Sequence, residues 1–267
     1  MADETQQPDE VEDHKMPLLD HLIELRTRLV YSIAAFFVCF VACYYFSSEI
    51  YAFLVRPLAK VWEGQSGRHM IFTGVAEAFF TYVKLSIWGG LFLAFPVIAT
   101  QLWIFVAPGL YKNERRAFLP FLAATPILFL MGAALAYYGI FPLVFKFFTS
   151  FETPGGEGTL PIELDPKVDQ YLDLVTKLTF AFGLSFELPV LLTLLARVGL
   201  MSSQALRSKR RFAIVGLFIF AAIVTPPDVI SMCSLAVPLI ILYELSIFSV
   251  RMVERDRARR RAEAGLD

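Results

Sequence analysis

Three glutamates in this sequence lie where a carboxylate has a chemical consequence. Glu24, in "HLIELRTRL", and Glu114, in "LYKNERR", each lie among basic residues beside an apolar segment. Glu187, in "FGLSFELPV", lies inside an apolar segment and has no opposite charge within one or two helical turns. An ionised group inside a bilayer is costly unless it is paired, hydrated or neutralised. This position favours a functional role for Glu187 over a structural one.

The first two glutamates can be accounted for more simply by the periodicity of the chain. Residues 18–29 place four leucines on one helical face and a polar set that includes Glu24 and Arg28 on another. This pattern predicts an amphipathic helix that leads into the membrane. Glu24 and Arg28 are spaced to pair with each other on that helix, and Glu114 has the same option with Arg115. Periodicity alone favours such solvated ion pairs.

The sequence contains no pattern that is typical of hydrolytic or metal chemistry. None of the three histidines lies in such a segment, there is no HExxH motif, and no glycine-rich phosphate-binding loop occurs. The three cysteines all lie in apolar stretches without metal-ligand spacing and are expected to be buried small hydrophobic residues: Cys39, Cys43 and Cys233. We therefore expect neither an enzyme nor a site for a metal or cofactor.

The elements that must position these glutamates are membrane-spanning helices. Of the 267 residues, 57% are hydrophobic and only 18% are charged, and the apolar residues occur in long blocks. A helix needs about 20 residues to cross the hydrocarbon core. The sequence predicts an all-α integral membrane protein in which residues 16–250 form six transmembrane helices, at approximately 29–46, 78–107, 117–148, 171–196, 211–225 and 229–250.

Proline governs the expected shape of this bundle. The motif "TPPD" at 225–228 ends a short fifth span and predicts a tight hairpin with the sixth. Five further prolines lie inside spans and are expected to bend them into a curved, cupped wall, although proline is also common in straight membrane helices: Pro96, Pro126, Pro142, Pro189 and Pro238.

The basic residues predict the orientation of the bundle. With the N-terminus in the cytoplasm, the cytoplasmic segments hold seventeen of the 24 Lys and Arg residues, against four in the opposite loops. Both termini are therefore expected on the cytoplasmic side. The composition of residues 1–15 predicts a disordered acidic tail, and that of 251–267 predicts a basic cytoplasmic tail.

Four motifs in order along the chain resemble the TatC family, the polytopic receptor subunit of the twin-arginine protein translocase. They are "HLIELRTRL", "FVAPGLYKNERR", "FGLSFELPV" and "TPPDVIS", and the resemblance covers roughly residues 17–250. It implies that Glu24 and Glu114 bind the consecutive arginines of signal peptides on folded cargo, with Arg26 and Arg115 supporting that surface. A guanidinium presents a planar fork that a carboxylate accepts with two hydrogen bonds.

The resemblance also implies roles for three further positions. Glu187 is expected to engage partners or signal peptides from the concave face, Pro57 to have a structural role in the first outer loop, and Asp228 to act in the final outer turn.

The implied partners are single-span proteins of the TatA and TatB type, twin-arginine signal peptides and membrane lipid, without nucleic acid. We expect a homo-oligomer within a receptor complex, located in the inner membrane of a bacterium and driven by the proton motive force. Two other hypotheses remain at this point. One is a secondary transporter or channel that uses Glu187 as an ion or proton site, and the other is a scaffold that only assembles partners.

Overall fold

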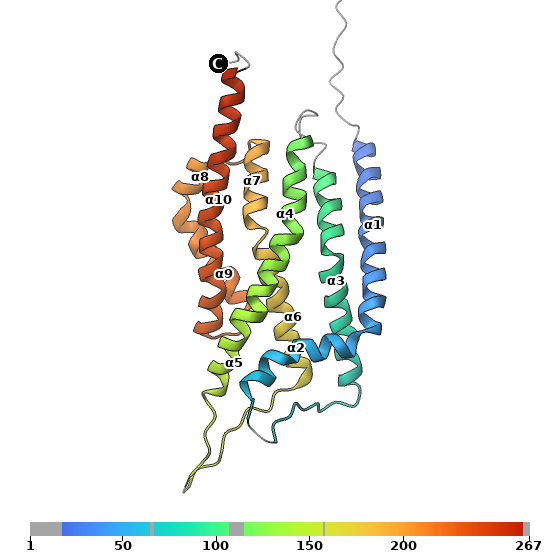
Figure 1. The fold of residues 1–267 in the computed structure, drawn as a ribbon, viewed down its shortest axis with the longest axis vertical. Helices are drawn as coiled ribbons and strands as arrows, with labels where there is room; N and C mark the ends of the chain where they lie inside the picture. Colours follow the sequence, from blue (N-terminus) through green and yellow to red (C-terminus); the bar gives the residue numbers. More distant parts are fainter. Residues whose placement is uncertain (1–17, 65–66, 107–114, 157, 264–267) are drawn as a thin grey trace, which may run out of the picture.

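The computed structural model describes residues 18–64, 67–106, 115–156 and 158–263, which form a bundle of long helices (Figure 1). In chain order the helices are α1 (Leu18–Tyr45), α2 (Ser47–Val61), α3 (Glu77–Val106), α4 (Arg115–Ala134), the π-helix η3 (Leu135–Ile140), α5 (Phe141–Thr149), α6 (Val168–Ser185), α7 (Leu188–Val198), α8 (Ser203–Ser208), α9 (Arg210–Val224) and α10 (Val229–Glu263).

The two ends of the bundle differ (Figure 1). At one end α1 begins and α10 ends, and we call this the terminal end. At the opposite end, which we call the loop end, α2 lies across the bundle and α5 ends. Within the described ranges, five helical segments are long and apolar enough to cross a bilayer. The 15 residues of α9 rise only about 22 Å, which is less than the roughly 30 Å hydrocarbon core.

The third and fourth spans are interrupted where proline removes a backbone donor. Pro142 lies in the first turn of α5, and the π-helix η3 precedes it, with Phe141 N donating to the carbonyl of Ala136 five residues earlier. Pro189 lies in the first turn of α7, and the helix breaks between Ser185 and Leu188. The bends predicted at these two prolines are therefore full changes of helix type or continuity.

The sequence prediction placed residues 47–77 in an outer loop, but the structure has the helix α2 there. A single proline, Pro57, lies inside α2 and leaves the carbonyl of Phe53 without its helical donor. The hydroxyl of Tyr137, in η3, donates to that carbonyl at 2.6 Å, and the two rings stack with centroids 4.4 Å apart. The hydroxyl of Tyr171 in α6 likewise donates to the carbonyl of Leu54 at 2.8 Å. These contacts fix α2 against the spans.

Small residues allow the spans to approach closely. A Cβ atom at Gly90 in α3 would lie 2.8 Å from the Cα atom of Phe40 in α1, and one at Gly132 in α4 would overlap the carbonyl oxygen of Phe182 in α6. Such close approach is a common basis of helix packing in membranes, where apolar burial no longer drives association.

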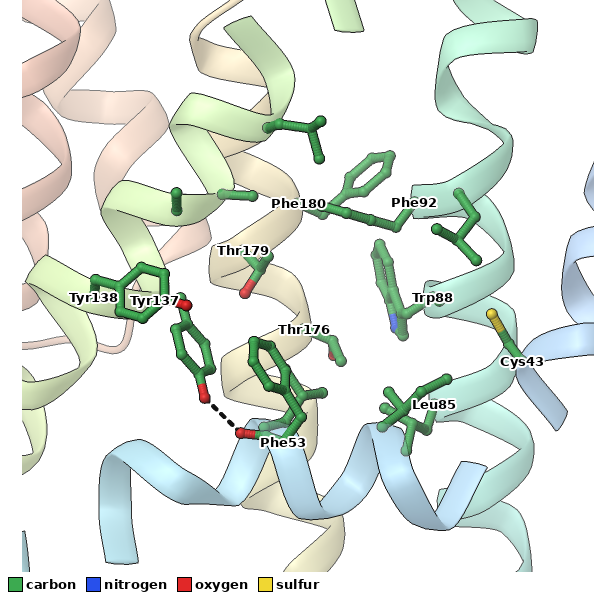
Figure 2. A pocket seen from close by; sticks show the side chains of 17 residues that line it. Cys43, Phe53, Leu85, Trp88, Phe92, Tyr137, Tyr138, Thr176, Thr179 and Phe180 are labelled. Carbon is green, nitrogen blue, oxygen red and sulfur yellow. Dashed lines mark hydrogen bonds between the residues drawn. The ribbon is translucent and has the colours of Figure 1, made fainter. Parts of the chain in front are cut away.

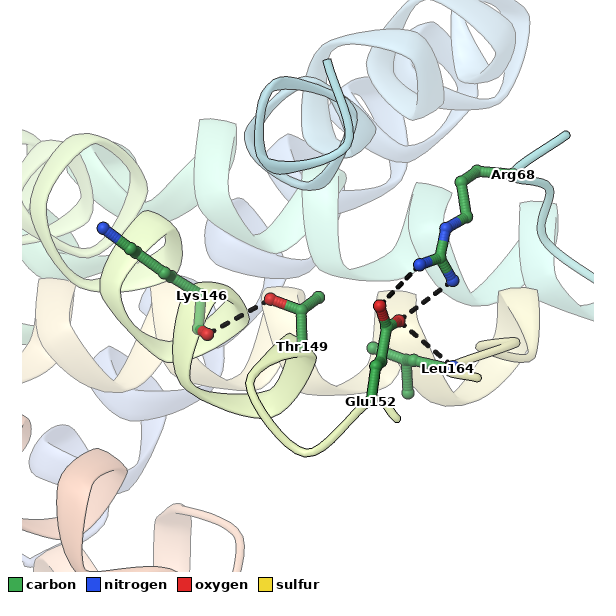
Figure 3. A network of polar contacts seen from close by, with 5 residues as sticks. All are labelled: Arg68, Lys146, Thr149, Glu152 and Leu164. Atoms are coloured by element: carbon green, nitrogen blue, oxygen red, sulfur yellow. Dashed lines mark hydrogen bonds and ion pairs between the residues drawn. The ribbon is translucent and has the colours of Figure 1, made fainter. Parts of the chain in front are cut away.

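A polar network joins two connecting segments at the loop end (Figure 3). Arg68, before α3, forms two hydrogen bonds to the carboxylate of Glu152, after α5, one of them 2.9 Å long. Glu152 also accepts from the backbone N–H of Leu164 at 3.2 Å. Nearby, Ile71 pairs with the segment before α6 through Ile71 N to Pro166 O, at 3.2 Å. Residues from both connections are thus held together.

Candidate functional site

Glu24 lies in the second turn of α1, at the terminal end, and makes one ion pair there. Its Oε1 atom is 3.3 Å from Nη2 of Arg28, one turn later on the same helix. Nη1 of Arg28 in turn donates to Oε1 of Gln101 in α3, at 3.2 Å. The i,i+4 pair predicted from periodicity is therefore present, and it is joined to a neighbouring span.

A second contact holds the same part of α1 against α3. The ring of His21 stacks on that of Phe105, with centroids 4.4 Å apart and an interplanar angle of 20°. Neither Gln101 nor Phe105 was found by sequence reasoning, because both lie in an apolar span with no charge to mark them. Their role depends on contacts between residues more than 70 positions apart.

The structure gives less detail on the other residues predicted for the signal-peptide surface. Arg26 is exposed on α1, between Glu24 and Arg28 in the sequence. Arg115 is the first residue of α4, which begins at the terminal end. Glu114 lies outside the described residues.

Glu187 occupies the break between α6 and α7. It precedes Pro189 and forms the N-terminal boundary of α7 without capping it through its side chain. Both carboxylate oxygens are buried and make no hydrogen bond within the described part of the chain. Thr125 of α4 lies beside this carboxyl group, and its hydroxyl is also buried without a hydrogen-bond partner of normal geometry among the described residues. Thr125 was not identified from the sequence, since a hydroxyl residue in a span carries no signal of its own.

This pair of unsatisfied groups is unusual for an interior, where buried polar groups are nearly always hydrogen-bonded. At the break, the backbone N–H of Glu187 bonds to the carbonyl of Leu184, three residues back, instead of continuing the regular helix. The arrangement leaves two unsatisfied polar side chains, those of Glu187 and Thr125, inside the bundle. Glu24 and Glu187 are not in contact and form two separate sites.

Pro57 and Asp228, the two residues predicted for the outer side, each lie beside a defined backbone contact. Pro57 is buried in α2, where it directs the Phe53 carbonyl to Tyr137. Asp228 accepts the backbone N–H of Ser231 through Oδ1 at 2.7 Å and so caps the start of α10. Within the described ranges, no group of three or more His, Cys, Asp or Glu side chains is placed to hold a metal ion.

Comparison with known proteins gives consistent matches over most of the chain. The family model described as "Sec-independent protein translocase protein (TatC)" matches residues 20–238. The Sec-independent protein translocase protein TatC of Magnetococcus marinus is 50% identical over 250 residues, covering 94% of this chain and 89% of that protein. The TatC protein of Escherichia coli strain K12 is 42% identical over 241 residues, covering 90% of each.

A solved structure is also similar. The crystal structure of a twin arginine translocase receptor, TatC, matches with a TM-score of 0.74 at 36% sequence identity. The match covers 87% of this chain and 98% of that chain.

Proposed function

Because the chain belongs to the TatC family of Sec-independent protein translocase proteins, we propose that it acts as the receptor subunit of a twin-arginine translocase in the inner membrane of a bacterium. In this role it binds the signal peptides of folded proteins and organises their export, driven by the proton motive force. The family match covers most of the chain and favours this role over a solute transporter or channel built around Glu187.

The observation that carries this proposal is the loosely engaged carboxylate of Glu24 at the terminal end. Charge-assisted hydrogen bonds between nitrogen and oxygen are usually about 2.7–2.9 Å long, whereas the Glu24–Arg28 contact is 3.3 Å. The side chains are 21% and 29% exposed, respectively. A carboxylate in this state can accept a better-aligned guanidinium from another molecule.

Exchange of one guanidinium for another is the mechanism that this geometry supports. An arginine of the signal peptide would bind Glu24 through two parallel hydrogen bonds, which a planar guanidinium forms and a lysine ammonium does not. Arg28 would keep its hydrogen bond to Gln101, so its guanidinium would remain beside the site with an acceptor. The contact between His21 and Phe105 would hold α1 in place during the exchange.

Glu114 supplies the second carboxylate of the proposed site. It directly precedes α4 in the sequence, and α4 begins at the same end of the bundle as α1. Two carboxylates at this end would bind the two consecutive arginines of one signal peptide. Arg26 and Arg115 would support this surface and attract the carboxylates and phosphates around it.

The terminal end is proposed to face the cytoplasm, where signal peptides arrive. The segments assigned to that side carry seventeen of the 24 Lys and Arg residues, and such residues hold segments on the cytoplasmic side. That α1 begins and α10 ends at the same end of the bundle supports an even number of crossings.

Glu187 is proposed as the point of contact with partner helices or with an inserted signal peptide. Its buried, unsatisfied oxygens would accept a hydrogen bond from a TatA- or TatB-type single-span protein more strongly than a hydrated group would. We also propose that copies of this chain assemble within the receptor complex.

Photo-crosslinking tests the proposed function. A twin-arginine signal peptide that carries a photoreactive residue beside its arginines is added to membranes containing the protein. An adduct to the beginning of α1 is expected, and a matched peptide with two lysines should give much less of it. A chain that only assembles partners, or that transports solutes, would give no adduct with either peptide.

A further inference from the structure

A cavity of about 360 Å³ lies between the spans towards the loop end (Figure 2). Its floor is buried and includes Leu85 of α3, Ala133 of α4 and Thr176 of α6. Its rim is exposed: Leu93 on α3 and Leu130 on α4 are 57% and 55% accessible. The cavity therefore opens sideways between α3 and α4, at a depth where the chain faces hydrocarbon.

Three hydroxyl groups of the lining already have hydrogen-bond acceptors within the protein. The hydroxyls of Thr176 and Thr179 donate to the carbonyls of their own helix four residues earlier, at 2.6 and 2.7 Å. The hydroxyl of Tyr137 donates to the carbonyl of Phe53. An apolar cavity of this kind does not hold ordered water, and an empty one would leave its walls without dispersion contacts. A hydrocarbon occupant satisfies both conditions.

The cavity is large enough for a flexible apolar chain. At about 30 Å³ for a group the size of a water molecule, the cavity holds roughly a dozen methylene groups, a large part of an acyl chain.

A cation lies at the edge of the cavity. The guanidinium of Arg56, in α2, lies 5.8 Å from the ring centroid of Phe53, which lines the cavity. Arg56 is exposed and forms no ion pair with any side chain in the described ranges. Lys60 is exposed one turn later on α2.

We propose that this cavity binds one acyl chain of a membrane phospholipid whose phosphate group lies against Arg56. Such an occupant matches both features of the site, an apolar slot within the bilayer and a cation where α2 crosses its end. Because α2 is attached to the spans at Phe53 and Leu54, a lipid in this slot would contact the same elements and stabilise α2 on the bundle.

Trp88 reports directly on the slot, because its side chain points into it (Figure 2). The test uses a full-length chain in which the other two tryptophans are replaced, Trp62→Phe and Trp103→Phe, in vesicles of phosphatidylcholine and phosphatidylglycerol. Bromine atoms on the acyl chains of one lipid or the other quench a tryptophan that they touch. Strong quenching of Trp88 is expected, and it should be greater when phosphatidylglycerol carries the bromine.

Substitutions that fill the slot separate a bound chain from surrounding lipid. Ala134→Phe, at the slot, should remove most of the quenching, as should Leu130→Phe at its rim, which serves if the first variant does not fold. Ala123→Phe is the matched control, because it is exposed on the same face of α4 about three turns away, and it should leave quenching unchanged. Arg56→Gln should abolish the preference for phosphatidylglycerol and keep quenching by both lipids.

Two results would overturn the proposal. Quenching that persists equally in the filled variants would show that bulk lipid alone reaches Trp88. Quenching that is weak at high protein-to-lipid ratio and rises on dilution would show that a second copy of the chain occupies the slot.

Discussion

The two glutamates that the structure describes at the candidate sites differ in what surrounds them. Glu24 lies at the end of a span and shares Arg28 with Gln101, so its charge is partly compensated and remains accessible. Glu187 lies at a helix break with both oxygens buried and without hydrogen bonds among the described residues. The first arrangement suits reversible exchange of cations, and the second suits a contact completed by another molecule.

Replacing Glu187 should impair transport without weakening the fold. Removing a buried carboxyl that has no hydrogen bond within the described chain relieves an unfavourable group, so Glu187→Ala is expected to keep or raise the melting temperature of the purified protein. Transport of a folded cargo by membrane vesicles should fall, while binding of the signal peptide is retained. Transport at the normal rate would show that the residue serves only to fill space.

Removing Arg28, the cation that competes for Glu24, should slightly increase the affinity for the signal peptide. An i,i+4 ion pair on a helix contributes about 0.3–0.5 kcal/mol, so Arg28→Gln should tighten binding of a twin-arginine peptide about two-fold. Equilibrium binding to the protein in nanodiscs measures this, and Lys60→Gln, which removes an exposed positive charge from α2 at the opposite end of the bundle, provides the comparison. A tenfold loss of affinity in Arg28→Gln would place Arg28 within the binding surface itself.

At the scale of the helices, proline sets the positions where the spans change direction. Pro57 removes one helical hydrogen bond in α2, and the carbonyl that it frees becomes the acceptor for Tyr137. Pro142 lies just after the π-helix that carries that same tyrosine. The two prolines thus act together to join α2 to the third span.

The link between Arg68 and Glu152 should stabilise the loop end. The side chains are only 18% and 17% exposed, and removing one partner of such a pair leaves a poorly solvated charge. Glu152→Gln should lower the free energy of unfolding by about 1–3 kcal/mol, visible as a lower melting temperature in detergent.

The exchanged pair provides the control for this prediction. Arg68→Glu combined with Glu152→Arg should recover part of the loss, and only part, because Glu152 also accepts from the N–H of Leu164. If the double variant is no more stable than the sum of the single changes implies, the two side chains do not interact.

The spans could be predicted from the sequence because apolar blocks of this length are typical of membrane-crossing helices. The helix α2 could not, since a search for membrane-length segments passes over an amphipathic helix of 15 residues. Pro189 signalled a bend, but whether a proline kinks or breaks a helix depends on the packing around it. At Gly132 the backbone of α6 comes close enough to exclude a side chain, and no local pattern records that approach.

The same distinction holds for the sites. Each candidate charge was visible as an exception to the surrounding apolar residues, and Glu187 was found for that reason. Gln101, Phe105 and Thr125 were not, because their roles arise from contacts across the bundle.

For the molecule as a whole, the two ends of the bundle carry different groups of residues. The terminal end carries Glu24 and the start of α4, whereas the loop end carries α2 and the linked connections (Figure 1). If the terminal end faces the cytoplasm, the proposed signal-peptide site at Glu24 and the helix α2 lie on opposite faces of the membrane. Glu187 then lies within a span between them.

Cysteine labelling tests this orientation. In a chain in which Cys39, Cys43 and Cys233 are replaced by alanine, single cysteines are introduced at exposed positions. Glu63→Cys and Thr159→Cys should react with an impermeant reagent added to intact cells, whereas Gln204→Cys and Arg255→Cys should react only after the membrane is opened. Labelling of Gln204→Cys from outside would invert or disprove the topology.

The most direct test of the account compares arginine and lysine signal peptides on the normal protein and on the double variant Glu24→Gln, Glu114→Gln. Each hydrogen-bonded contact between charged groups contributes on the order of 1.5–3 kcal/mol, so losing one should weaken binding about ten- to hundred-fold. The normal protein should prefer the arginine peptide, and the double variant should show little preference, because the carboxylates that match the guanidinium fork are gone. An equal preference for the arginine peptide in both proteins would contradict the claim that these two glutamates bind the arginines of the signal peptide.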